Sequence, residues 1–279
     1  MVMPSVANGR LDLSETRALL FLPASNPRAI ARARASDADL VILDLEDAVK
    51  REDKLAARDA AVAAVAQPWP MPVAIRINGS ASEWHGEDVA AVTSSRAELI
   101  VVPRVAGAKE VVAVAGQVSR PVAAMIETAA GVLAVSDIAR VAAALIAGTN
   151  DLAADLKLPP GAGRAPLQTA LQWVVLAGRA AGVSVFDGVF NSIADADGFA
   201  AEAAQSRAFG FDGKSLIHPD QIALCHAAFA PTADEIARAE RLVAAATGGA
   251  ERFEDEMIEA MHVEAARRLL ARARGSRRR

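Results

Sequence analysis

Eight short runs of apolar, largely β-branched residues alternate with longer alanine-rich stretches, and this alternation constrains the fold more than any other feature. In the longer stretches apolar residues recur every three or four positions, which is the period of a helix that packs on a sheet. Strands that alternate with helices pair in parallel. The short runs predict strands at 17–22, 40–46, 73–78, 98–103, 121–127, 144–148, 184–189 and 210–217.

Eight strand–helix units within about 215 residues are the number that closes a (β/α)8 barrel. An open, doubly wound sheet is the alternative, but no Gly-x-Gly-x-x-Gly follows an early strand to support a dinucleotide site. The sequence therefore predicts an α/β protein with a TIM barrel. Helices are expected at 27–36, 51–65, 109–118, 138–143, 166–181 and 195–209.

The pattern changes after residue 229, so we assign 1–230 to the catalytic barrel and 231–279 to a C-terminal helical extension, or lid, with a basic tail. Thr232 and Glu235 have the spacing of a capping box and predict a helix at 234–246. Two glycines then break the pattern. Segment 251–261 and a basic helix to about residue 274 are expected to follow, with a solvated tail at 275–279.

Composition excludes several classes of protein. The net charge of −4 does not favour nucleic-acid binding, and no apolar run is long enough to predict a membrane span. Residues 1–16 lack the apolar core of a signal peptide. The single cysteine, Cys225, is unable to form an internal disulfide and fits a reducing compartment. We therefore expect a cytoplasmic protein.

Polar residues close or follow most of the predicted strands. In a barrel of this kind the active site lies at the carboxyl ends of the strands. Charged residues are almost never fully buried unless they are paired or bound to metal, so several carboxylates at one mouth need a cation. The polar residues at these ends are Asp44, Glu46, Asp47, Arg76, Asn78, Arg104, Glu127, Asp151, Asp187, Asp212 and Lys214.

Glu127 and Asp151 are the best candidate metal ligands, because they end neighbouring predicted strands about 4.8 Å apart. Two carboxylates with water in the remaining positions describe a Mg²⁺ site. Zinc is disfavoured, since the chain has four histidines and no cysteine cluster. The alternative is that each acid caps a helix or forms a surface ion pair.

Arg76 lies among β-branched residues, where an arginine is costly to bury without an anionic partner. Its planar fork suits a carboxylate. Two partners are consistent with the sequence. One is a substrate carboxylate, and the other is the chain's own Glu46 or Asp47.

Six ordered motifs resemble those of the citrate lyase β-subunit-like family, the branch of the HpcH/HpaI aldolase superfamily that cleaves carbon–carbon bonds in CoA esters. The resemblance extends from about Arg17 to Ala230. The motifs are FLPASNPR at 21–28, DLEDAV at 44–49, IRIN at 75–78, MIETAAGV at 125–132, GTNDLAADL at 148–156 and GFDGKSLIHPDQI at 210–222.

The resemblance implies a TIM barrel that assembles as a homotrimer or hexamer and binds Mg²⁺ through Glu127 and Asp151. It implies that Arg76 holds the carboxylate of a 2-keto acid, and that Glu46 and Asp47 order metal-bound water or bind the CoA end. Family members carry an aspartate in a C-terminal segment that covers a neighbouring subunit's site and acts as acid/base. Glu259 occupies that place here, one carbon longer.

The sequence therefore predicts a Mg²⁺-dependent lyase that cleaves a malyl-, citramalyl- or citryl-type CoA thioester into an acyl-CoA and a 2-keto acid. Two alternatives remain open. One is a metal-dependent aldolase that acts on free hydroxy-keto acids, which a basic groove at Arg28 and Arg32 for CoA phosphates would argue against. The other is a citrate lyase β subunit that needs α and acyl-carrier partners, with the arginine-rich 267–279 tail as a docking segment.

Overall fold

The computed structural model describes residues 11–276, with side chains up to 273. The chain folds into two compact units, one that ends at Ala228 and one that begins at Phe229. The last three residues of the predicted basic tail, 277–279, lie outside the described residues. No helix among the described residues is long and apolar enough to cross a membrane.

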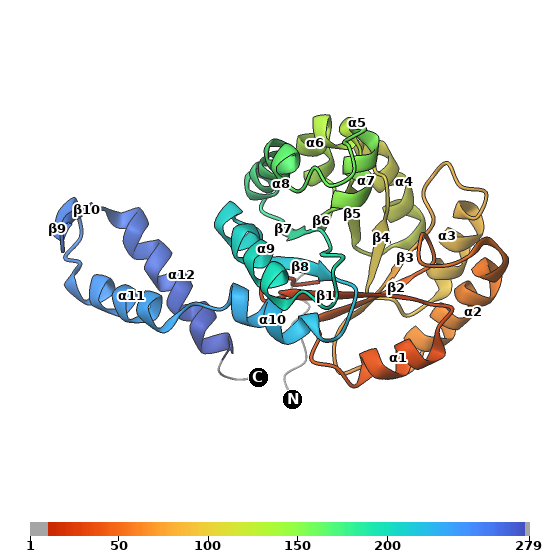
Figure 1. The fold of residues 1–279 in the computed structure, drawn as a ribbon, viewed down its shortest axis with the longest axis horizontal. Coiled ribbons are helices and arrows are strands. Elements are labelled where there is room, and N and C mark those ends of the chain that lie inside the picture. The colour runs from red at the N-terminus through yellow and green to blue at the C-terminus, as the bar shows by residue number, and fades with distance from the viewer. Residues whose placement is uncertain (1–10, 277–279) are drawn as a thin grey trace. The chain divides into compact units, whose positions relative to one another are not determined.

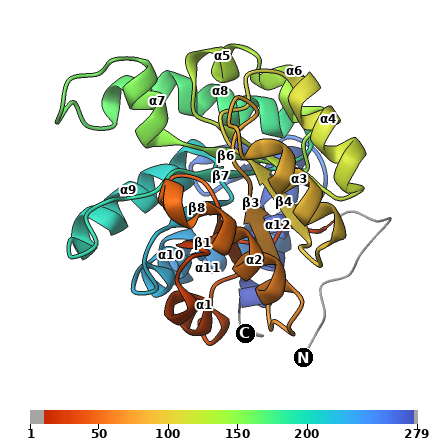
Figure 2. The same ribbon diagram turned by 90° about the vertical axis from the view of Figure 1, so that its right-hand side faces the viewer.

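The first unit is a closed barrel of eight parallel strands, each paired with the next and the last paired with the first. Helices surround the strands (Figures 1 and 2). The predicted TIM barrel is therefore confirmed. The strands are β1 (Ala18–Pro23), β2 (Leu40–Asp44), β3 (Val73–Arg76), β4 (Leu99–Val102), β5 (Val122–Ile126), β6 (Ala144–Ala147), β7 (Ser184–Asp187) and β8 (Gly213–Leu216).

The helices of this unit start and end where local chemistry requires it. The Asn26 side chain accepts a hydrogen bond from the N–H of Ala29 at 3.1 Å and caps the first helix, and Gly210 ends the ninth at φ +97°. The helices are α1 (Pro27–Arg34), α2 (Lys54–Val65), α3 (His85–Ser94), α4 (Ala108–Val118), α5 (Ala129–Leu133), α6 (Val135–Ala139), α7 (Thr149–Asp155), α8 (Gln168–Ala181), α9 (Ala196–Phe209) and α10 (Gln221–Phe229), with 3₁₀ turns at Arg51–Asp53 and Ala165–Leu167.

The barrel interior is filled by alternate residues of the strands. Ile42, Ala74 and Met125 belong to its apolar core. Two positions further along the same three strands, the inward-facing row continues with Asp44, Arg76 and Glu127. The two-residue period of a strand therefore carries polar side chains from the core to the carboxyl-end mouth.

Every strand except the first ends earlier than predicted. The second was expected to reach Glu46 but ends at Asp44, whose carboxylate accepts hydrogen bonds from the N–H groups of Glu46 (2.9 Å) and Ala48 (3.0 Å). These bonds turn the chain out of the sheet. Glu46 consequently lies in the loop that follows the strand, at the barrel mouth.

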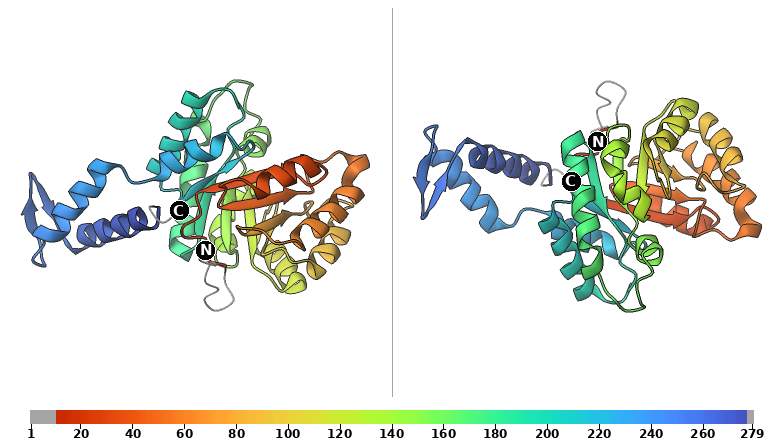
Figure 3. Two further views of the ribbon diagram at one scale, coloured as in Figure 1. Left: turned by 90° about the horizontal axis from the view of Figure 1, so that it is seen from below. Right: turned by 90° about the horizontal axis from the view of Figure 1, so that it is seen from above.

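The second unit contains α11 (Ala233–Ala245), β9 (Glu251–Phe253), β10 (Glu256–Ile258) and α12 (Ala260–Ser276). The predicted capping box is confirmed, because the N–H of Glu235 donates to Thr232 Oγ1 at 3.1 Å and the N–H of Thr232 donates to Glu235 Oε2 at 2.7 Å. The two helices lie side by side, with the two strands at one end of the pair (Figure 3).

The two helices predicted in the extension are present, and the segment between them forms an antiparallel hairpin at 251–258. Glu254 takes the left-handed conformation (φ +54°) that the turn requires. Phe253 and Ile258 are buried against Ala239 and Leu242 of α11. Packing against the helix, rather than strand length, therefore stabilises this hairpin.

Candidate active site

A cavity of about 440 Å³ lies at the carboxyl ends of the barrel strands. Its lining residues all belong to the first unit, and they include the sequence-predicted Arg76, Asp47, Glu127 and Asp151. The structure thus brings four of the six predicted site residues around one cavity. Glu46 contacts this group through Arg76.

Arg76 is clamped by two carboxylates. Its Nε and Nη2 atoms lie 2.6 and 2.7 Å from the two oxygens of Asp44, and its Nη1 atom lies 2.8 Å from Glu46 Oε2. The guanidinium also lies over the Phe21 ring, 5.3 Å from the centroid. Of the partners that the sequence left open within the chain, Glu46 pairs with Arg76, and Asp47 makes no ion pair with it among the described residues.

Asp44 is the functional residue that sequence reasoning missed as a partner of Arg76. It is buried, and it lies directly opposite Arg76 in the register of β2 and β3. Both residues face inward at the last position of their strands. Two residues at the ends of neighbouring strands, with side chains on the same inner face, are expected to contact each other, and this is the signal that could have identified the pair.

A single guanidinium, that of Arg76, lies beside two buried carboxyl groups, and this arrangement shifts the pKa values of Glu46 and Arg76. Burial outweighs the attraction of Arg76 and raises the pKa of Glu46 to about 8. Burial alone would lower the pKa of Arg76, but attraction to Asp44 and Glu46 raises it above its ordinary value. Arg76 is therefore a permanently charged group held in one orientation.

Glu127 lies just past β5 and is buried. Its Oε1 atom accepts a hydrogen bond from the backbone N–H of Arg104 at 2.6 Å, whereas its Oε2 atom is buried without a hydrogen-bond partner. Burial, and then repulsion by Asp151, raise the pKa of Glu127 to about 7. A buried carboxylate oxygen with no donor is the arrangement expected of a cation ligand.

Asp151 lies in the first turn of α7 and is partly exposed. Burial and repulsion by Asp47 raise its pKa, and Arg104 opposes that change from 3.1 Å away. Among the described residues no group of three or more histidine, cysteine, aspartate or glutamate side chains forms a cation cage. Two carboxylates with positions left for substrate and water fit Mg²⁺, which keeps several such ligands.

Gly148 gives the Glu127 carboxylate its room. A Cβ atom at position 148 would lie 2.1 Å from Glu127 Oε2 and 2.4 Å from Glu127 Cβ. We therefore expect Gly148→Ala to displace the carboxylate and to destabilise the fold by about 1–3 kcal/mol. Calorimetry of Mg²⁺ binding and thermal unfolding measure the two effects. Gly116→Ala, at a helix position where a Cβ meets nothing within 4 Å, is the control: it should leave Mg²⁺ binding unchanged and should not destabilise the fold, because alanine is the better helix former.

Ser215 is a further polar residue of the cavity that the sequence did not single out. It lies on β8, and its hydroxyl is buried without a hydrogen-bond partner. Glu259, by contrast, is an exposed residue of the second unit, between β10 and α12. Its backbone N–H donates to Nδ1 of His262 at 2.9 Å.

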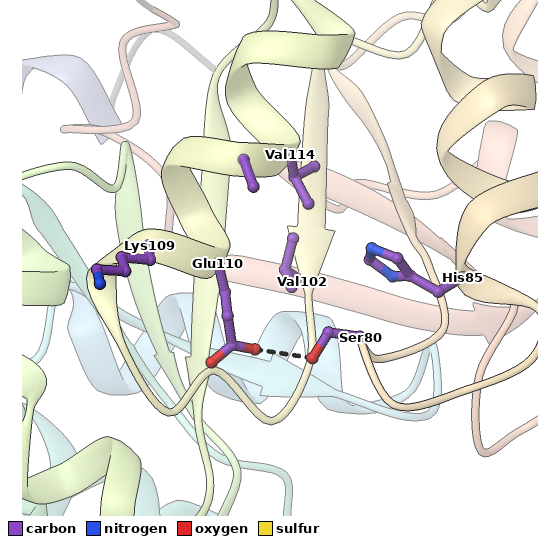
Figure 4. A pocket seen from close by; sticks show the side chains of 7 residues that line it. Ser80, His85, Val102, Lys109, Glu110 and Val114 are labelled. Carbon is purple, nitrogen blue, oxygen red and sulfur yellow. Dashed lines mark hydrogen bonds between the residues drawn. The ribbon is translucent and has the colours of Figure 1, made fainter.

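A smaller cavity of about 230 Å³ lies between α3 and α4, outside the barrel (Figure 4). Apolar side chains of Val102, Ala113 and Val114 form much of its wall, and a hydrogen bond of 2.9 Å joins Ser80 to Glu110 there. None of the sequence-predicted site residues lines it. The barrel mouth is therefore the candidate active site.

A closed parallel barrel with a clamped arginine and two cation-suited carboxylates at its mouth defines an enzyme of the TIM-barrel class. The family model for HpcH/HpaI aldolase/citrate lyase matches residues 17–219, and a model for carbon–carbon bond lyases of the TIM-barrel fold matches residues 165–275. The chain belongs to the HpcH/HpaI aldolase/citrate lyase family, and it is therefore a lyase-family enzyme.

Individual relatives agree with this assignment. The chain is 38% identical to a (3S)-malyl-CoA thioesterase of Cereibacter sphaeroides, over 92% of this chain and 94% of the relative. It is 30% identical to the citrate lyase subunit beta of Escherichia coli K12, over 92% and 93%. The structure of CitE from Mycobacterium tuberculosis with magnesium, acetoacetate and coenzyme A is similar at a TM-score of 0.85 and 32% identity, over 92% and 98%.

Proposed function

We propose that this chain is a Mg²⁺-dependent carbon–carbon lyase that cleaves a 3-hydroxy-dicarboxylyl-CoA thioester into an acyl-CoA and a 2-keto acid. Malyl-, citramalyl- and citryl-type thioesters are the candidate substrates. The unpartnered Oε2 atom of Glu127, beside Asp151 and facing the same cavity as Arg76, is the observation that carries this proposal. The M. tuberculosis relative that holds magnesium and coenzyme A supports it.

In this proposal Glu127 and Asp151 hold Mg²⁺, with the remaining ligands from substrate and water. When bound, Mg²⁺ supplies Lewis-acid polarisation of the oxygen that becomes the keto group. Two of the five N–H donors of Arg76 bond to Asp44 and a third, on Nη1, to Met125 Sδ at 3.7 Å, so one donor on Nη1 and one on Nη2 remain for a substrate carboxylate. Because the clamp fixes the guanidinium, that carboxylate is oriented before the bond breaks.

We assign the proton transfer to Glu259 of a neighbouring copy, within a homo-oligomer that is a trimer or hexamer. Two exposed apolar side chains, Met257 and Met261, flank Glu259 in the second unit and are suited to burial against another subunit. Light scattering of the purified chain measures the assembly. A monomer that cleaves substrate at full rate would contradict the assignment.

Asp47 and Glu46 are proposed to contact water or the CoA end of the substrate. Asp47 is exposed and lines the cavity.

The buried single cysteine, Cys225, supports a reducing compartment, and we propose the cytoplasm.

Thioester hydrolysis is the second candidate function, because four relatives at 36 to 38% identity are named (3S)-malyl-CoA thioesterase. The two reactions share a substrate but break different bonds. Cleavage of the carbon–carbon bond of malyl-CoA releases glyoxylate and leaves the thioester intact in acetyl-CoA. Hydrolysis releases malate and a free CoA thiol. The products therefore distinguish the two functions.

The test is a product assay of the purified full chain with malyl-CoA and citramalyl-CoA, with Mg²⁺ and with EDTA. We expect a 2-keto acid and acyl-CoA in equal amounts, with Mg²⁺ only. A free thiol without keto acid would replace the lyase by the thioesterase. No turnover of either CoA ester would favour a citryl carrier-protein substrate, as for a citrate lyase β subunit, or a free hydroxy-keto acid.

A further inference from the structure

Arg104 contacts both proposed cation ligands through different atoms. Its backbone N–H donates to Glu127 Oε1 at 2.6 Å, and its Nη1 atom donates to Asp151 Oδ1 at 3.1 Å. Arg104 follows β4 and takes a left-handed conformation, φ +53°, which costs an L-residue about 1–2 kcal/mol. The backbone is thus held in an unfavourable conformation that aims its N–H at Glu127.

The two contacts differ in how firmly the fold holds them. The hydrogen bond to Glu127 comes from the backbone and reaches a buried carboxylate. The ion pair to Asp151 comes from a long side chain that is 50% exposed, and Asp151 itself is 32% exposed. The guanidinium therefore has open solvent to move into, whereas the backbone N–H is fixed.

The negative charge of the neighbouring carboxylates explains why the Arg104 guanidinium lies beside Asp151. Asp151 is repelled by Asp47, and Glu127 is repelled by Asp151. Arg76 is already committed to Asp44 and Glu46. Arg104 is consequently the cation that touches Asp151 directly.

We propose that Arg104 is an internal counter-cation, whose guanidinium neutralises Asp151 in the metal-free enzyme and leaves when a divalent cation binds, while its backbone N–H stays on Glu127. The proposal rests on the proposed Mg²⁺ site. A metal ion held by Asp151 would compete with the guanidinium for the charge of that one carboxylate. The ion pair therefore weakens the binding of Mg²⁺ alone and keeps the empty site from accumulating negative charge.

The exposure of the Arg104–Asp151 ion pair sets how much the loss of the guanidinium should change the affinity for Mg²⁺. Exposed and half-exposed ion pairs contribute little, typically a factor of about two to five in an equilibrium constant. Removing the guanidinium should therefore lower the Kd for Mg²⁺ by about two- to fivefold. Lysine in its place keeps a positive charge and should leave the Kd within about twofold of the wild-type value.

The test is isothermal titration of the full chain with MgCl₂ alone, without substrate, at pH 8, which lies above the pKa of Glu127 (about 7). The variants are Arg104→Gly and Arg104→Lys. Glycine is chosen because it tolerates the positive φ, and Arg104→Asn is a second neutral variant if the glycine chain unfolds. Arg140→Gln is the matched control, because it removes the same charge from a surface pair with Asp137 and should leave the Kd unchanged.

Tighter Mg²⁺ binding by the neutral variants, with the lysine and control variants near wild type, is the expected result. Equal or weaker binding by the neutral variants overturns the counter-cation role while the metal site stands. Absence of Mg²⁺ binding in the wild type overturns the proposed metal site, and the counter-cation role with it. An equal gain in Arg140→Gln would show that net charge alone acts, and would also overturn the proposal.

Discussion

Replacement of Glu127 by glutamine should abolish metal-dependent cleavage and leave the fold intact. Glutamine keeps an oxygen for the N–H of Arg104 but loses the charge that the buried Oε2 atom presents. Changes behind a metal ligand already cost about 10- to 100-fold, so loss of the ligand itself should lower kcat/KM by more than about 100-fold. Steady-state assays with varied Mg²⁺ measure this loss.

Thermal unfolding separates loss of the site from loss of the fold. Mg²⁺ should raise the Tm of the wild type, because a ligand that binds only the native state stabilises it, and should not raise that of Glu127→Gln. Burial raises the pKa of Glu127 from 4.5 to about 7, so this carboxyl lowers the stability of the fold progressively as the pH rises between those values, and the full penalty is present at pH 8. Without Mg²⁺, Glu127→Gln should therefore be at least as stable as the wild type at pH 8.

The matched control for this variant is Glu110→Gln. Glu110 is a partly buried acid of α4 that accepts hydrogen bonds from Ser80 and from the backbone of Ala106, and it lines the smaller cavity and not the one at the barrel mouth. It should keep wild-type activity and wild-type stabilisation by Mg²⁺. If Glu127→Gln also keeps Mg²⁺-dependent turnover, Glu127 is not a ligand and the proposed site is wrong.

The barrel and the gathering of the candidate site residues at its mouth were predictable because both depend on local periods. Alternation of strands and helices gave the eight units, and the two-residue period of a strand places Arg76 and Glu127 inside the mouth. The capping box at Thr232 is a similarly local signal. The prediction of these features required no knowledge of distant contacts.

The remaining features depend on contacts between distant segments. In the sequence, an aspartate at the end of a strand is typical of a residue that begins a turn. Only the register of β2 against β3 makes Asp44 the partner of Arg76. The left-handed backbone of Arg104 is held by a carboxylate 23 residues away. The hairpin at 251–258 has strands of three residues, too short for a periodic signal, and depends on packing against α11.

Replacement of Arg76 by methionine should be the most destabilising single change at the site. It leaves the buried carboxylate of Asp44 without its cation, whereas Glu46, whose pKa burial raises to about 8, takes up a proton at neutral pH. Removing one partner of a buried ion pair costs about 3–5 kcal/mol, so the Tm should fall by about 10 °C for a chain of this size. Circular dichroism during heating measures the shift.

A second substitution separates the structural role of Arg76 from its role in the reaction. Arg76→Met with Asp44→Asn removes the stranded charge and should recover part of the lost stability, but no activity, because position 76 no longer presents a guanidinium to the cavity. Arg58→Met is the matched control: Arg58 is equally buried and pairs with Asp88 at 2.7 Å and Glu87 at 2.6 Å, and none of the three lines the cavity.

The Arg58→Met control should lose stability in the same way as Arg76→Met, yet keep its turnover at temperatures where it remains folded. Turnover by the Arg76→Met/Asp44→Asn protein at the wild-type rate would show that Arg76 serves only to neutralise its neighbours. A loss of kcat/KM that persists after stability is recovered would instead identify the guanidinium as a group that binds substrate. The clamp on Arg76 would then serve both the fold and the reaction, since the two carboxylates that make the arginine necessary also fix its direction.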